Sequence, residues 1–294
     1  MSSIFQHSVR ILNRDVSIAP LITVRLLFGL MMFAGTLRFM YNGWVEQLYI
    51  QPRYFFHYYG FEWVSLLAGD GMHYVFLGMA VLAAFIAIGF LYRISSFLVF
   101  LAFTYVELID ATNYLNHYYF ISIFSLFMAL FPAHRRFSVD AFLWPSIKRS
   151  SIPFWVIGAL RLQLGIVYFF AGVAKLNYDW LCRAEPLSTW FVPFRELPVV
   201  GKLFSFKLTA YLFSWSGAIF DLSVPFLLAF RKTLPFAYLA VVVFHVITWL
   251  MFPIGMFPWV MILLTWVFFP SSFHEKLISK LEALFPSRKI TSVA

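Results

Sequence analysis

Apolar stretches of roughly 15–21 residues, nearly free of charge, constrain this chain more than any other feature. They cover residues 19–38, 72–91, 94–110, 118–132, 154–174, 210–230, 234–251 and 254–270. In hydrocarbon every backbone polar group must be paired within the protein, so only helices and closed barrels cross a bilayer. Stretches of this length suit helices through an apolar core of about 30 Å, and they lack the alternation of barrel strands. The sequence therefore predicts an all-α, polytopic transmembrane helical bundle of about eight spans.

Composition and the connecting segments agree with one membrane domain over residues 1–294. Hydrophobic residues make up 62% of the chain and charged residues 12%, about half the charge of a soluble domain. Residues 176–209 are too polar to span and are expected to form an outer cap. Residues 271–294 read as a basic amphipathic tail on the membrane surface. The first 19 residues have no apolar run, so no cleavable signal peptide is expected.

Lysine and arginine are concentrated in alternate connections between the predicted spans. One set of connections, which would lie on one side, carries Arg10, Arg14, Arg93, Arg135, Arg136, Lys148, Arg149, Arg231, Lys232, Lys276, Lys280, Arg288 and Lys289. On the other side, the connections after the third and seventh spans carry none. Because cytoplasmic loops are enriched in these residues, both termini are predicted to be cytoplasmic. The same topology accounts for most of the +9 net charge, so no nucleic-acid partner is expected.

Several polar residues are predicted to meet near the extracytoplasmic face, although they come from different spans. These are Glu107, Asp110, Asn113, Asn116, His117, Lys175 and His245. Arg161 and Asp221 are predicted to lie deeper in their spans. Polar groups in spans are costly, and they are usually paired or functional. Their convergence on one face favours a functional site there.

The stretch 154–174 and the residue after it give the clearest pattern. Arg161, Gly165, Tyr168, Gly172 and Lys175 follow one another at intervals of 4, 3, 4 and 3 residues. This spacing places them on one face of a helix. The two glycines would let another backbone or a flat ligand approach that face closely.

Each of these residues also has a purely structural interpretation. Lys175 could be an anchor that extends its amine to the interface, and His245 could hydrogen-bond a backbone carbonyl. Asp221 could form a structural ion pair with Arg161, and Asp110 could cap a helix. The glycines around the central tyrosine could serve helix packing alone.

The residues that most often bind metal ions are sparse. His117 and His245 have too few cysteine or carboxylate partners for a preferred metal site, so none is predicted. The single cysteine, Cys182, excludes both an intramolecular disulfide and a cysteine-based cluster.

Several strings resemble the membrane domain of vitamin K-dependent gamma-glutamyl carboxylases and their bacterial relatives, the HTTM proteins. They occur in family order over about residues 14–270. The strings are RLLFG at 25–29, YRIS at 92–95, NHYY at 116–119, SVD at 138–140, VYFFAGVAKLNYDW at 167–180, DLS at 221–223, FH at 244–245 and IGMF at 254–257. The long string that contains Lys175, with NHYY upstream, is far more specific than any of the short ones.

The resemblance implies a carboxylase-like carbon–carbon lyase that uses vitamin K hydroquinone, as phylloquinol or menaquinol, with O₂ and CO₂. Lys175 would be the base that activates the hydroquinone, and Asn116 and His117 would hydrogen-bond the quinone oxygens. The other residues expected at the quinone site are Tyr168, Gly172, His245 and Arg161. A lysine acts as a base near neutrality only where its neutral form is favoured, as desolvation at an apolar span end would do.

The same resemblance implies a bacterial plasma-membrane protein in contact with lipid and reduced quinone, its site toward the extracytoplasmic face and its substrate a glutamyl peptide or protein. Animal carboxylases continue into a large domain that grips such substrates, whereas this sequence ends at Ala294. Two alternatives therefore stay open. One is a quinol-dependent enzyme that acts on a lipid or a small acid. The other is a non-catalytic protein that binds a quinone or lipid, or a transporter subunit.

Overall fold

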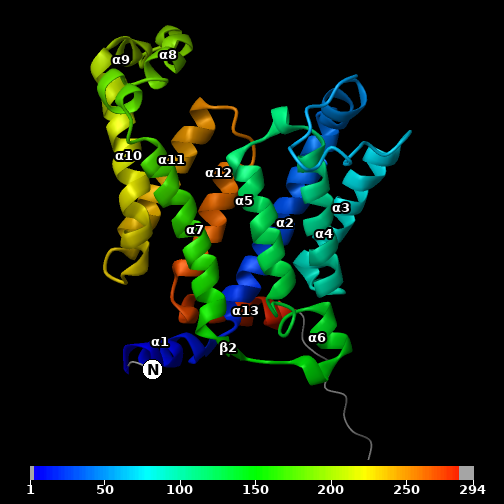
Figure 1. The fold of residues 1–294 in the computed structure, drawn as a ribbon. Coiled ribbons are helices and arrows are strands. Elements are labelled where there is room, and N and C mark those ends of the chain that lie inside the picture. Colours follow the sequence, from blue (N-terminus) through cyan, green and yellow to red (C-terminus); the bar gives the residue numbers. More distant parts are fainter. Residues whose placement is uncertain (1–2, 285–294) are drawn as a thin grey trace, which may run out of the picture. The chain divides into compact units, whose positions relative to one another are not determined.

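The computed structural model describes residues 3–284, and these divide into two compact units (Figure 1). Unit 1 comprises Met1–Leu160 and Leu263–Ala294, and unit 2 comprises Arg161–Ile262. The helix α7 (Phe154–Ala174) crosses the boundary between them, as does α12 (Phe257–Leu264). That residues 1–294 act as one domain stays a prediction.

Unit 1 consists mainly of long helices, and helices that are consecutive in the chain are neighbours in space. They are α2 (Ala19–Tyr41), α3 (Gly71–Ile88), α4 (Tyr92–Ile109) and α5 (Asn116–Leu130). Each packs against the next in the chain. The closest approach is at Gly29 of α2, where an added Cβ would lie 2.4 Å from the backbone nitrogen of Ala87. The absence of a side chain at Gly29 therefore lets α2 and α3 touch backbone to backbone.

Short elements precede, connect or follow these helices in the chain. They are η1 (Glu46–Ile50), η2 (Ala111–Asn113), α6 (Val139–Leu143), η3 (Pro145–Ile147), and a two-stranded antiparallel sheet of β1 (Asp15–Ser17) and β2 (Ser151–Pro153). The sequence pattern does not predict this sheet. In its register Val16 lies opposite Ile152, which is buried.

Two buried charged residues fasten the segment that carries α6 to the long helices. Arg25 of α2 donates to the carbonyl oxygens of Ala133, at 2.9 Å, and Phe137, at 2.5 Å. Asp140 of α6 accepts from the backbone amides of Leu91, at 2.7 Å, and Tyr92, at 2.9 Å. Asp140 thereby satisfies donors that the first turn of α4 would otherwise leave unpaired.

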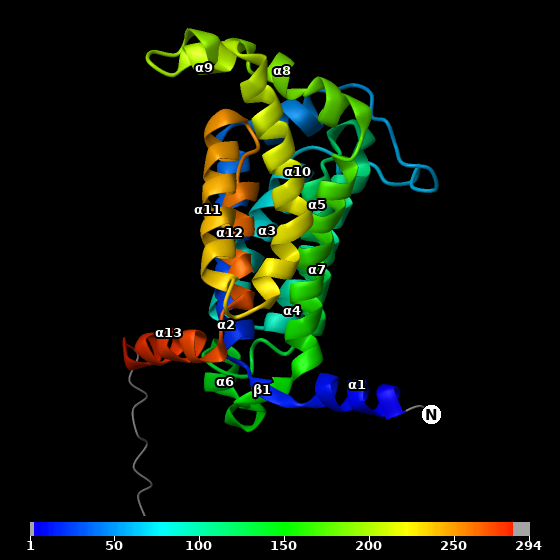
Figure 2. The same ribbon diagram turned by 90° about the vertical axis from the view of Figure 1, so that its left-hand side faces the viewer.

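Helix α13 (Ser271–Leu284) packs against α2 and runs at a steep angle to it, and α1 (Ser3–Asn13), which projects to the side, also runs at a steep angle to α2 (Figures 1 and 2). The axis of α13 is bent by 109° from that of Phe257–Phe268. His274 fixes this helix by hydrogen bonds of 3.0 Å to the Thr23 hydroxyl and to the Trp266 carbonyl oxygen. The expected tail helix is thus observed as far as Leu284. Its continuation to 294 lies outside the described residues.

Unit 2 contains the second part of α7, the first part of α12, and the helices α10 (Lys207–Ala229) and α11 (Leu234–Met251). Residues 176–209, expected to form a cap, fold into η4 (Asp179–Arg183), α8 (Leu187–Trp190), η5 (Val192–Glu196) and α9 (Gly201–Ser205). Figure 1 shows α8 and α9 beyond one end of α10. Trp180 joins this cap to α10, since its indole nitrogen donates to the Ser214 carbonyl oxygen at 2.7 Å.

The observed helices confirm an all-α membrane protein but not the span count. Six helices are long and apolar enough to cross a membrane, or up to seven if Phe257–Phe268 and Ser271–Leu284 form one broken span. Two predicted stretches, 154–174 and 234–251, coincide with α7 and α11. The predicted stretch 118–132 is observed as α5, which has only 15 residues. The prediction of about eight spans, and with it the side of each terminus, is not confirmed.

Candidate functional site

An ion pair between the half-buried Lys175 and the buried Asp221 lies at the end of α7 in unit 2. The Lys175 Nζ atom is 2.5 Å from the Asp221 Oδ2 atom, and it also donates to the Ala171 carbonyl oxygen at 3.2 Å. The Asp221 side chain is 4% exposed and that of Lys175 is 18% exposed. The amine also lies 5.2 Å from the centre of the Trp180 ring, within cation–π range. The lysine is therefore fixed in direction and remains partly accessible.

Aromatic residues adjoin this pair along α7 and α10. The Tyr168 hydroxyl and the His245 Nε2 atom are 3.0 Å apart, and both residues are buried. Phe220, next to Asp221 in sequence, packs edge-on against Tyr168 and stacks on Phe244 at 4.2 Å between ring centres. Buried phenol and imidazole groups need hydrogen-bond partners, and here each satisfies the other. Through its Nε2 atom, His245 thus pairs with a side chain.

The predicted face of α7 is confirmed from Gly165 to Lys175, and its neighbour there is α10. A Cβ added at Gly172 would lie 2.7 Å from the Leu222 Cγ atom and 2.8 Å from the Leu222 backbone nitrogen. One added at Gly165 would lie 3.6 Å from the Pro225 Cβ atom. Leu222 thus fills the space beside Gly172, and this glycine serves helix packing. The prediction that Gly172 contacts a bound quinone is not supported by this geometry.

The prediction of an ion pair between Arg161 and Asp221 is wrong. Among the described residues of unit 2, the carboxylate of Asp221 pairs with Lys175 instead. The close approach at Gly172 places Asp221, one residue before Leu222, beside the end of α7 where Lys175 lies. Arg161 is more than three helical turns earlier in the same helix.

Asn116 and His117 belong to unit 1, where they begin α5. The Tyr114 hydroxyl donates to the Asn116 Oδ1 atom at 3.0 Å, and the His117 ring packs edge-on against that of Tyr118. Asn116 is exposed and His117 is half-buried. Their role in binding quinone oxygens stays a prediction.

The structural interpretation of Asp110 is confirmed. Its Oδ1 atom accepts from the Thr112 amide at 3.0 Å and from the Thr112 hydroxyl at 2.9 Å, which caps η2. The same oxygen accepts from the Phe56 amide at 3.3 Å. Asp110 therefore shapes the loops at this end of α4.

A family model for the HTTM domain matches residues 13–273, which is most of the chain. The chain belongs to the HTTM domain family. The HTTM domain is associated with the vitamin K-dependent carboxylase family, and the apolar helices identify an integral membrane protein. No solved structure gives a significant match.

Two residues of this HTTM domain contact the lysine but were not among the predicted site residues. The sequence pattern suggests a structural pair for Asp221 and gives Trp180 no role beyond ending a matching string. The sequence signal that could have identified Asp221 as a site residue is an acidic residue inside a predicted span, since such residues usually have a basic partner. The sequence could not identify that partner, because the choice depends on how α7 and α10 pack.

The packing of α7 on α10 in the HTTM domain gives a first prediction. Gly172→Ala is expected to lower the free energy of unfolding by about 1–3 kcal/mol, because the new methyl group overlaps the backbone at Leu222. Gly165→Ala, on the same helix face, meets only an ordinary contact and should change stability by no more than about 1 kcal/mol, in the stabilising direction. Thermal unfolding of both variants in detergent checks this. Equal effects would mean that α10 does not approach α7 closely at Gly172.

Proposed function

We propose that this protein is a carboxylase-like membrane enzyme that activates a reduced quinone of the vitamin K type at Lys175. The observation that carries the proposal is the Lys175–Asp221 ion pair, beside the hydrogen-bonded Tyr168 and His245. The lysine lies in the string that most specifically resembles the carboxylases. Membership of the HTTM family supports the same reaction class.

The pair is suited to accept a proton. The Lys175 amine is held in place by Asp221 and is 18% exposed, so it would take the proton of a quinol hydroxyl group. The Asp221 carboxylate would keep the amine directed toward that hydroxyl group. After taking up that proton, the ammonium group can balance the negative charge left on the donor.

The neighbouring residues suit a flat, apolar ring. Trp180 covers one side of the amine, and Phe220 and Phe244 add aromatic surface along α10 and α11. Ligand sites of this kind are mostly apolar with a few fixed polar groups. Tyr168 and His245 supply a hydroxyl and an imidazole whose orientations are held by their mutual hydrogen bond.

The reduced quinone would supply the reducing power that turns O₂ into a strong base, which no side chain could provide. The net reaction is balanced: reduced quinone, O₂, CO₂ and a glutamate γ-C–H bond give quinone epoxide, water and a γ-carboxyglutamate. The epoxide keeps one oxygen atom of O₂, and the other leaves as water. The residues of this chain would bind, orient and deprotonate the quinol.

Product analysis tests both the reaction and the acceptor. The full chain in lipid nanodiscs would be supplied with phylloquinol, O₂ and labelled bicarbonate, with either a short glutamyl peptide or a lipid extract. The proposal predicts epoxide together with label in the peptide. Epoxide formation with label only in the lipid fraction would show that a lipid or small acid, and not a glutamyl peptide, accepts the CO₂. No epoxide from a folded preparation would contradict the enzymatic proposal and favour a non-catalytic quinone-binding protein.

A further inference from the structure

A large cavity of unit 1 has a strongly cationic lining and is not used by the proposed reaction. Its volume is about 1180 Å³, and it lies where α2 begins, α3 ends and the segment around α6 passes. The charged residues of its described lining are Arg25, Arg135, Arg136, Lys148, Arg149 and Glu282. Five cations against one acid make the cavity attractive to an anion.

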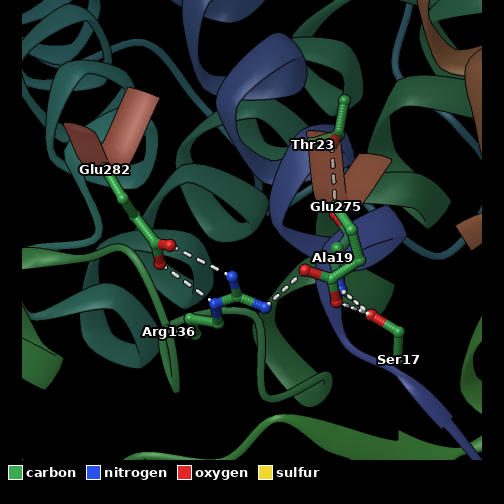
Figure 3. Close-up of polar contacts among 6 residues, drawn as sticks. All are labelled: Ser17, Ala19, Thr23, Arg136, Glu275 and Glu282. Atoms are coloured by element: carbon green, nitrogen blue, oxygen red, sulfur yellow. Dashed lines mark hydrogen bonds and ion pairs between the residues drawn. The ribbon is translucent and has the colours of Figure 1, made fainter. Parts of the chain in front are cut away.

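Two of these cations already have partners. Arg25 is bonded to backbone carbonyl oxygens. Figure 3 shows the Arg136 guanidinium between Glu282 and Glu275, at 3.0 Å and 2.8 Å. Hydrogen bonds to Glu282 and Glu275 raise the pKa of Arg136 above its ordinary value. Arg136 therefore forms part of the cavity wall, and the Glu282 carboxylate is already paired with it.

The remaining three cations have no carboxylate partner within residues 3–284. The backbone amide of Arg149 donates to the carbonyl oxygen of Arg135 at 3.0 Å. This bond holds side by side two arginines that are far apart in sequence. Lys148 precedes Arg149, whose guanidinium donates to the Lys148 carbonyl oxygen at 2.8 Å. Arg135, Lys148 and Arg149 together form a cationic cluster in the cavity lining, and a phosphate group is an anion that such side chains bind well.

The rest of the lining is mostly apolar, and three of its large apolar residues are exposed. Leu30 and Ile88 are each 51% exposed, and Phe142 is 73% exposed. Leu30 and Ile88 belong to α2 and α3, both candidate membrane spans. A soluble phosphate would gain nothing from these residues, whereas a lipid would place acyl chains on them.

We propose that this cavity binds an anionic phospholipid, with the phosphate on the cationic cluster and acyl chain on Leu30, Ile88 and Phe142. Basic pockets beside membrane helices recognise anionic headgroups in this way. The predicted cytoplasmic position of these basic segments agrees, because that leaflet carries anionic lipid. The site lies in unit 1 and does not depend on the proposed reaction.

Native mass spectrometry of the full chain, titrated with phosphatidylglycerol or phosphatidylcholine of the same acyl chains, tests the proposal. We expect phosphatidylglycerol to bind at least about 10-fold more tightly, and Arg135→Gln/Lys148→Gln/Arg149→Gln to remove that preference. The matched control is Arg93→Gln/Arg231→Gln/Lys232→Gln, which removes equal charge from residues outside the cavity lining. It should keep the preference.

Two further measurements cover the case in which the triple variant unfolds and distinguish a lipid site from a phosphate site. If the triple variant unfolds, Lys148→Gln alone removes one exposed cation and should weaken phosphatidylglycerol binding about 5-fold. Glycerol 3-phosphate, which has the headgroup chemistry without acyl chains, should compete at least about 100-fold more weakly than the lipid. Equal competition would show a phosphate site and overturn the lipid proposal. Equal binding of the two lipids, or equal losses in both triple variants, would overturn the cavity as an anion site.

Discussion

Lys175→Ala is expected to lower the rate of epoxide formation from reduced vitamin K by about 10²- to 10⁴-fold, the range that general-base catalysis contributes. The substitution removes the nitrogen that would take the quinol proton. It also leaves the buried Asp221 carboxylate without its cation. Breaking a buried pair from one side costs about 3–5 kcal/mol, so a loss of folding could imitate a loss of catalysis.

The double variant Lys175→Ala/Asp221→Ala separates these two effects. Removing both partners leaves no unpaired buried charge, so its stability should exceed that of Lys175→Ala. Its epoxide formation should still be lost. Chromatography of the quinone products and thermal unfolding of the same preparations provide the two readouts. Epoxide formation close to the wild-type rate in a folded double variant would remove Lys175 from the mechanism.

The second large effect is expected from Asp221→Asn, which keeps the shape of the side chain but not its charge. The carboxylate holds the Lys175 amine at 2.5 Å and offers a place for its proton. With asparagine the amine loses both, and a small displacement of a catalytic group can cost up to about 100-fold. We expect kcat for epoxide formation to fall about 10- to 100-fold, with the KM for quinol nearly unchanged.

A double-mutant cycle shows whether Asp221 acts through Lys175. Adding Asp221→Asn to Lys175→Ala should cause little further loss of kcat, because residues that act as a unit are not additive. Losses that multiply would mean that Asp221 contributes independently of the lysine. If Asp221→Asn keeps the wild-type kcat, the ion pair with Lys175 has a structural role only.

The parts of the fold that followed from the sequence are those governed by local pattern. The boundaries of α7 and α11 were predicted because each is a long apolar run with few polar residues. The face of α7 was predicted because helical spacing alone aligns Gly165, Tyr168 and Gly172. Strands β1 and β2 were missed because three residues are too few for a recognisable alternation.

The partner of Asp221 depends on packing, which sequence spacing does not reveal. Its depth along α10 suggested Arg161, but depth along separate helices is a poor guide to contact between them. The missing side chain at Gly172 lets α10 come close and brings Asp221 to Lys175. From the sequence, the space beside Gly172 could be filled either by another helix or by a ligand. In the structure Leu222 of α10 fills it.

The most direct test of the account is a comparison of wild type with Lys175→Arg. Arginine keeps the positive charge and can retain a pair with Asp221, but a guanidinium does not give up its proton under protein conditions. Both proteins would be reconstituted in lipid nanodiscs with phylloquinol and O₂, and epoxide would be followed over time. We expect epoxide from the wild type and at least about 100-fold less from a folded Lys175→Arg variant. Equal epoxide formation by the two would contradict the assignment of Lys175 as the base.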